Sequence, residues 1–294
     1  MNFSNQEFNI LDNDGLILKK NILEKEDINK IKKIILDQPV GKGVRESHYS
    51  ISISSLLIKL LKLDFKKIKE SLYLLDVKNR LKLDFISNTF FKIESNLVMM
   101  DGYWNSITES AILPWHSDQA YSGEKDVKNI ASPDIFYLKF FFYLTNVGPN
   151  NGCTSYIPCS HKITYAVRSC LFEKKIKYEP FWELKDLVKF IKKKENYNHI
   201  LEKLESKEQL NDFFLKADMI LTNPEKNYFD FQASPGDLLI FNDGGVHRGS
   251  KPSITERVAL RYLYSKKWFI KNLIINFWCP HTDSNREPID YKSI

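Results

Sequence analysis

Residues 234–250 read SPGDLLIFNDGGVHRGS and carry the strongest structural signal in the chain. The apolar run at 238–241 predicts a strand that ends in a glycine-rich turn. Gly244 and Gly245 allow the backbone to bend closely around a site, and His247 follows two residues after Gly245. Residues 257–264, RVALRYLY, predict the next strand. The stretch therefore predicts two strands in succession, with a histidine presented near the turn that follows the first.

A second candidate site lies in ILPWHSDQAY at 112–121. Residues two apart in an extended strand point to the same face, so His116 and Asp118 can reach one ion while Ser117 points away. A neutral imidazole and a carboxylate suit iron(II). Together with His247 they would form a triad of two histidines and one carboxylate, which leaves three metal positions open, as in non-haem iron oxygenases.

Two arginines follow the distal histidine. Arg257 lies ten residues after His247, and its guanidinium fork can bind a carboxylate in bidentate fashion, which Lys cannot imitate. Arg257 is therefore a candidate anchor for a dicarboxylic cosubstrate. Arg261 shares the same strand face, and it would either anchor the cosubstrate instead or meet an anionic substrate. The alternative for each arginine is a surface ion pair.

The order of elements predicts a mainly β protein with flanking helices. Short strands with turn signals between them favour a sandwich or jelly-roll barrel, here a double-stranded β-helix of the cupin-like kind. Helices are expected at 25–37 and within 52–86, in a helical N-terminal part, and residues 166–226 read as a charged helical insert within one domain spanning 1–294. Strands are expected within 8–18, 89–93, 97–104, 135–145, 153–158, 227–233, 238–242 and 257–264.

The strand at 136–145 has two contrasting faces. Alternate residues from Phe136 to Leu144 are uniformly apolar and should pack against helices. The other face mixes aromatic and polar groups, as a barrel interior with a site would. Lys139 and Tyr143 on that face are candidates for cosubstrate contact; the alternatives are a lysine at a strand end and a core tyrosine.

Composition limits the protein class. The 294 residues are 43% hydrophobic and carry a net charge of +6 from 43 basic and 37 acidic residues, which argues against disorder and against a concentrated nucleic-acid surface. Four cysteines without a CxxC pair indicate a reducing compartment, and the N-terminus lacks signal-peptide features. No apolar run approaches the roughly 20 residues of a membrane span. A cytoplasmic protein that acts on a small molecule is expected.

Five stretches together resemble the phytanoyl-CoA dioxygenase-like family of iron(II)- and 2-oxoglutarate-dependent oxygenases. The matching stretches are PWHSDQAY (114–121), FYLTNVGPNNGCTSYIPCSHK (142–162), the 234–250 and 257–264 segments, and DGLILKKNILEKEDINKI (14–31). The resemblance covers most of the chain outside 166–226. One departure is Cys159, which stands where the family's PGSH element has glycine.

The resemblance implies iron(II) bound by His116, Asp118 and His247, with 2-oxoglutarate and dioxygen as cosubstrates. It implies pairing of 2-oxoglutarate with Arg257 and a hydroxyl contact from Ser250. Related halogenases lack the carboxylate that Asp118 supplies, so the implied reaction is hydroxylation of an unactivated C–H bond with release of succinate and carbon dioxide. Desaturation and ring closure are lesser options.

The sequence leaves the substrate and two rival functions open. Trp115, Gln119, Tyr121 and Trp104 are candidates for the substrate mouth, or they simply pack the strands. The 166–226 insert is either a lid that excludes water or a solvated helical segment. The rivals are a non-catalytic jelly-roll binding protein and a metal-dependent hydrolase that uses the same ligands with zinc.

Overall fold

The computed structural model describes residues 1–37, 46–51, 59–107, 111–118, 133, 136–179 and 181–266, with backbone alone for 46–51. Its helices are α1 (Asn5–Asp14), α2 (Lys25–Leu36), α4 (Phe65–Arg80), α5 (Leu83–Phe91), α6 (Ser160–Phe172), α7 (Leu184–Lys192), α8 (Lys194–Leu201) and α9 (Lys207–Thr222). Its strands are β1 (Leu16–Lys19), β2 (Glu46–Ile51), β3 (Asn96–Asn105), β4 (Leu113–His116), β5 (Tyr137–Tyr143), β6 (Thr154–Tyr156), β7 (Leu238–Asn242), β8 (His247–Gly249) and β9 (Arg257–Ser265).

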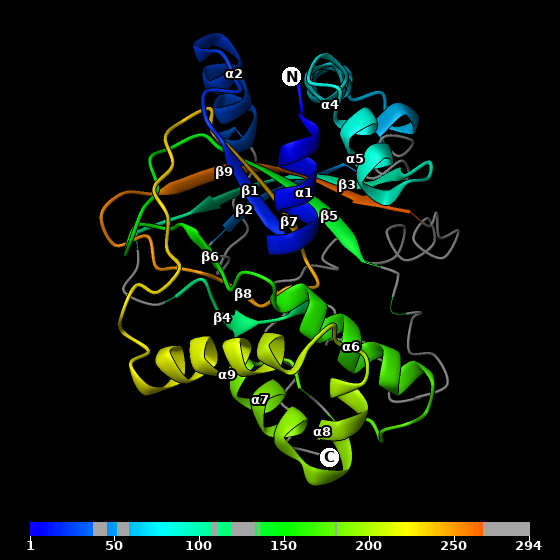
Figure 1. Ribbon diagram of the computed structural model, residues 1–294. Coiled ribbons are helices and arrows are strands. Elements are labelled where there is room, and N and C mark those ends of the chain that lie inside the picture. The colour runs from blue at the N-terminus through cyan, green and yellow to red at the C-terminus, as the bar shows by residue number, and fades with distance from the viewer. Residues whose placement is uncertain are drawn as a thin grey trace.

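The strands form two antiparallel sheets. The larger sheet has the order β1-β7-β5-β9-β3-β2, and the smaller sheet has the order β4-β8-β6. Helices α1, α2, α4 and α5 cover the outer face of the larger sheet, whereas α6 to α9 lie below the smaller sheet (Figure 1). The expected fold of sheets flanked by helices at the N-terminus and in an insert is confirmed as a mixture of helices and antiparallel sheets.

The two faces of the larger sheet bury different kinds of side chain. Leu138, Phe140 and Phe142 of β5 belong to a large apolar cluster with the N-terminal helices. Tyr262 of β9 lies on the same face and donates its hydroxyl to the carbonyl of Leu74 in α4, at 2.7 Å. The opposite residues, such as Phe141 and Tyr143, face the smaller sheet in a separate cluster. The expectation of an apolar helix-facing side for strand 136–145 is confirmed.

One predicted strand, within 8–18, is confirmed only in its last residues, and two others are wrong. Residues 8–14 belong to α1, because Ser4 and Glu7 form a capping box at its start and Gly15, with φ of 83°, ends it. Strand β1 therefore begins only at Leu16. Residues 89–91 continue α5, which ends at Lys92 in the left-handed region. Residues 227–233 form a loop with one isolated bridge, from Ala233 to Val147.

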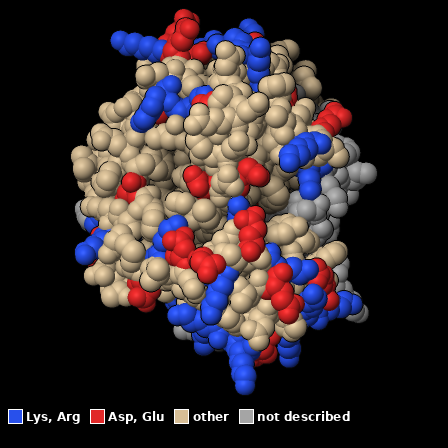
Figure 2. Space-filling model, in the orientation of Figure 1, with Lys and Arg blue, Asp and Glu red and all other residues tan. Residues whose placement is uncertain are grey.

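The helical insert has its own apolar core, and it begins earlier than expected. Helix α6 starts at Ser160, six residues before the predicted boundary at 166, and α9 ends at Thr222. The insert core includes Ile157 and Val246, which flank the strands of the smaller sheet. Basic and acidic side chains are interspersed over this helical part of the molecule (Figure 2). Among the described residues, no helix is long and apolar enough to cross a membrane.

Candidate metal centre

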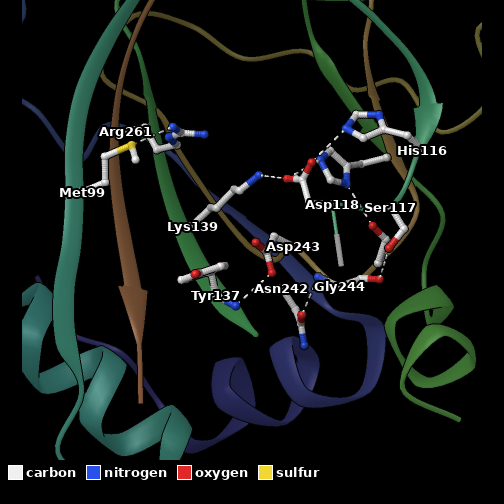
Figure 3. Close-up of polar contacts among 12 residues, drawn as sticks. Met99, His116, Ser117, Asp118, Tyr137, Lys139, Asn242, Asp243, Gly244 and Arg261 are labelled. Carbon is white, nitrogen blue, oxygen red and sulfur yellow. Dashed lines mark hydrogen bonds and ion pairs between the residues drawn. The ribbon is translucent and has the colours of Figure 1, made fainter. Parts of the chain in front are cut away.

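Two histidines and one aspartate meet where β4 ends and β8 begins. His116 and His247 are direct partners in the antiparallel pairing of these strands. The Nε2 atom of His116 lies 3.2 Å from Oδ1 of Asp118, and the Nε2 atom of His247 lies 3.6 Å from Oδ2 (Figure 3). One ligand atom from each of the three residues lies within 4.8 Å of the others, so the group could hold one metal ion.

The orientation of both imidazoles is fixed by backbone carbonyls. Nδ1 of His116 contacts the carbonyl of Pro114 at 2.7 Å, and Nδ1 of His247 contacts that of Gly245 at 2.9 Å. A carbonyl oxygen can only accept, so Nδ1 carries the proton in both rings and Nε2 presents its lone pair. This arrangement holds a histidine ready for a metal.

The turn between β7 and β8 is packed tightly against its surroundings. A side chain at Gly245 would overlap the hydroxyl of Tyr156, so this position requires glycine. The carbonyl of Gly244 accepts hydrogen bonds from Ser117 at 2.9 Å and from Thr164 of α6 at 2.5 Å. The turn that presents His247 is therefore tied both to the His116 segment and to the insert.

The insert also continues the smaller sheet beside His116. The backbone N–H of Ser117 donates to the carbonyl of Trp182 at 3.1 Å, and His116 forms an isolated antiparallel bridge with Glu183. The Trp182 ring lies 4.9 Å from the imidazole of His116, measured between ring centroids. The residues just before α7 thus form one wall of the His116 environment.

Burial and charge place His247 and Asp118 in the charge states that a metal needs. Burial, followed by the proximity of His116, lowers the pKa of His247 to about 4, so this imidazole is neutral at pH 7. Burial alone would raise the pKa of Asp118. Lys139 and the hydrogen bonds with the two histidines outweigh that effect and hold the pKa well below its usual range. Asp118 is accordingly an anion at neutral pH.

The triad opens into a pocket between the two sheets. Besides Asp118, five of the predicted site residues line it: His116, His247, Lys139 and, from β9, Arg257 and Arg261. Sequence reasoning missed the remaining lining residues, which are Tyr103, Ile112, Leu113, Phe141, Thr154, Phe241, Arg248 and Gly249. The alternation of residues along β3 and β7 is the signal that could have indicated Tyr103 and Phe241.

The two arginines have different surroundings. Arg257 donates from Nε to the Asn105 side-chain oxygen at 2.8 Å and from Nη1 to the carbonyl of Gly152 at 3.3 Å. Arg261 forms a buried bidentate ion pair with Asp101, with N–O distances of 2.8 and 2.5 Å. A planar guanidinium held by a carboxylate in this way is strongly oriented. Arg261 therefore already has a carboxylate bound within the protein.

Two candidate cosubstrate contacts lie behind the pocket wall. The hydroxyl of Tyr143 is fully buried and accepts from the backbone N–H of Thr154 at 3.2 Å. The hydroxyl of Ser250 contacts the thiol of Cys153 at 3.5 Å. Neither residue is among those lining the pocket. Lys139, in contrast, extends from β5 into the pocket and pairs with Asp118 (Figure 3).

The substrate-mouth candidates are dispersed. Trp104 donates its indole N–H to Glu256 at 2.7 Å and packs against the helix-side core, away from the pocket. Trp115 packs against the insert core, and the guanidinium carbon of Arg248 lies 5.1 Å from its ring centroid. Gln119 and Tyr121 lie outside the described residues.

Comparisons with known proteins point to one family. The family model described as phytanoyl-CoA dioxygenase (PhyH) matches residues 85–258. A comparison with curated protein sequences finds no match. Among solved structures, HygX from Streptomyces hygroscopicus, with nickel and 2-oxoglutarate bound, has 15% identity and a TM-score of 0.53, covering 91% of this chain and 89% of that one. EctD from S. alaskensis, in its apoform, has 12% identity and a TM-score of 0.51, covering 90% and 77%. These likenesses demonstrate a shared fold.

Proposed function

The chain belongs to the phytanoyl-CoA dioxygenase family, and we propose that it is an iron(II)- and 2-oxoglutarate-dependent dioxygenase that hydroxylates a C–H bond of a small molecule. The observation that carries this proposal is the convergence of His116, Asp118 and His247 within 4.8 Å, in a pocket that two arginines also line. Two imidazole nitrogens and one carboxylate fit iron(II) and leave positions for a chelating cosubstrate and dioxygen.

The protein's contribution begins with the metal ligands. His116 and His247 would bind iron through Nε2, because hydrogen bonds to Pro114 and Gly245 orient Nδ1 away from the site. Asp118 would supply the anionic oxygen. When bound, iron(II) with 2-oxoglutarate and dioxygen supplies the oxidising power for hydroxylation, with succinate and carbon dioxide as products.

Arg257 is the proposed anchor for the distal carboxylate of 2-oxoglutarate. It lines the pocket from the first residue of β9, and its guanidinium can bind a carboxylate in bidentate fashion. Arg261 is the less favoured anchor, because Asp101 already occupies its guanidinium fork. Tyr143 and Ser250 are proposed to support 2-oxoglutarate binding from behind the pocket wall. Lys139 would contact the cosubstrate from β5.

Aromatic side chains and the insert are proposed to exclude water from the pocket. Tyr103, Phe141 and Phe241 line the pocket with apolar surface, which protects a reactive centre from side reactions. The insert at 166–226 is proposed as a lid, supported by the contacts of Trp182 and Glu183 with the His116 segment. Trp115, Gln119 and Tyr121 remain candidates for substrate contact. Trp104 is the weakest of that group because its indole is bonded to Glu256.

The test is an anaerobic titration of the protein with iron(II) and 2-oxoglutarate, monitored by the weak visible charge-transfer band of the chelate. The band should form in the wild type and be absent in His116→Ala. Succinate release in air with a panel of small metabolites then identifies the substrate class. A reaction that runs without oxygen and 2-oxoglutarate would indicate a hydrolase, and absence of any iron-dependent band would indicate a binding protein.

A further inference from the structure

Lys139 and Arg261 both line the pocket, but they pair with different carboxylates. Arg261 has Asp101, which is not a member of the metal triad. Lys139 pairs with Asp118 through Oδ2, and no other carboxylate among the described residues lies within ion-pair distance of its ammonium group. The internal partner of Lys139 is therefore the same carboxylate that a metal requires.

The surroundings of Lys139 offer little other compensation for its charge. The side chain is 5% exposed, and the strand register places it beside Phe241 of β7 and Leu263 of β9. Its Nζ lies 5.5 Å from the centroid of the Phe241 ring. A buried ammonium group in apolar surroundings depends on the anions next to it, because hydration is largely lost.

A metal ion between the three ligands would stand next to this ammonium group. Two positive charges that share one carboxylate in a poorly hydrated pocket repel each other, and salt screens buried charges weakly. Lys139 should therefore oppose binding of a divalent metal on its own. The 2-oxoglutarate dianion brings negative charge into the same pocket and offsets that repulsion.

We propose that Lys139 couples metal binding to cosubstrate binding, an inference that rests on the proposed function. The lysine makes the metal-only form unfavourable and the form with metal and cosubstrate favourable. In the whole enzyme, metal affinity then depends on the 2-oxoglutarate concentration. By thermodynamic reciprocity, the metal raises the affinity for 2-oxoglutarate by the same factor.

Three roles for Lys139 have different signatures in binding. A residue that only contacts 2-oxoglutarate would change the affinity for the cosubstrate and leave metal-only binding unaltered. A residue that only positions Asp118 would weaken metal binding when it is replaced. A coupling residue strengthens metal-only binding when its charge is removed, and it reduces the gain that 2-oxoglutarate brings. The sign of the change in metal-only affinity thus separates the three roles.

The experiment is a calorimetric titration of the full chain with Mn²⁺ under nitrogen, with and without 2-oxoglutarate, for wild type and Lys139→Met. Methionine keeps the unbranched shape and removes the charge. We expect Lys139→Met to bind Mn²⁺ alone about tenfold more tightly than wild type, and the gain from 2-oxoglutarate to fall about tenfold, within the usual range of coupling between sites. Lys139→Arg keeps the charge and should stay within about threefold of wild type for Mn²⁺ alone.

Thermal unfolding of each variant establishes that it is folded, and Lys139→Gln replaces the methionine variant if that one does not unfold cooperatively. Equal or weaker binding of Mn²⁺ alone by the uncharged variant overturns the coupling role. If wild type and His116→Ala both fail to bind Mn²⁺ with or without 2-oxoglutarate, the proposed function itself fails. The two failures are therefore distinguishable.

Discussion

The two faces of the larger sheet differ in what their side chains do, although they alternate along the same strands. On the helix side, Phe140 and Phe142 of β5 are fully buried in a wholly apolar cluster. On the inner side, Lys139 directly precedes Phe140 in sequence but reaches the candidate metal centre. Neighbouring residues of one strand therefore serve stability and chemistry separately. Substitutions on the two faces should have separable effects on folding and on turnover.

Loss of a metal ligand on the inner side should give the largest effect. His116→Ala should lower succinate formation by about 10³-fold or more, because one of three metal ligands is removed. The variant should still unfold cooperatively in urea, since the helix-side core is untouched. Turnover within tenfold of wild type would show that His116 does not hold the metal.

A matched change on the helix side should act on stability alone. Phe140→Ala should lower the free energy of unfolding by about 4 kcal/mol, from lost burial and the cavity that remains. Phe140→Leu should recover most of this loss. Urea denaturation measures both variants, and Mn²⁺ titration at a temperature where they are folded should give wild-type affinity. A strongly altered Mn²⁺ affinity in either Phe140 variant would show that the two faces do not act separately.

Lowering the pH should destabilise the folded protein through His247 in the candidate metal centre. The folded-state pKa of His247 is about 4, whereas an unfolded histidine titrates near 6.5, so the unfolded chain takes up the proton first as pH falls. The stabilising contribution is complete above pH 6.5 and is lost as pH falls through about 4, with a loss of about 3 kcal/mol from this residue.

Urea denaturation of metal-free protein at pH 7, 5.5 and 4.5 measures this contribution. His247→Gln should have a shallower dependence on pH than wild type, whereas Phe140→Leu, changed on the other face, should keep the wild-type slope. Identical slopes for wild type and His247→Gln would mean that His247 titrates normally in the folded protein.

Loss of Arg257, on the inner face, should give the smallest of these effects. Arg257→Ala should raise the KM for 2-oxoglutarate about 30-fold, the size expected for a lost charge-assisted contact, with little change in kcat at saturation. Arg261→Ala should instead lower stability, because it leaves Asp101 buried without its guanidinium partner. Steady-state kinetics and urea denaturation separate the two. A KM that rises only in Arg261→Ala would move the anchor there.

Sequence periodicity was informative where neighbouring residues decide the outcome. The alternation in 136–145 correctly separated the helix face from the inner face, and the spacing of His116 and Asp118 placed both beside one point. The capping box of Ser4 and Glu7 was not recognised, so the helix that precedes β1 was not predicted. Ion pairs between side chains of distant strands could not be anticipated. The pairing of Arg261 with Asp101 depends on the register of β3 and β9, which no local pattern specifies.

The isolated bridge between His116 and Glu183 has a consequence for self-association. β4 is an edge strand of the smaller sheet, and unpaired backbone groups on its free edge would offer a template to a strand of another molecule. Residues 182–183 cover that free edge beside His116. Excision of residues 166–226 would therefore expose the unpaired edge of β4 and would also remove α7, α8, α9 and part of α6, so the shortened chain would be prone to aggregate.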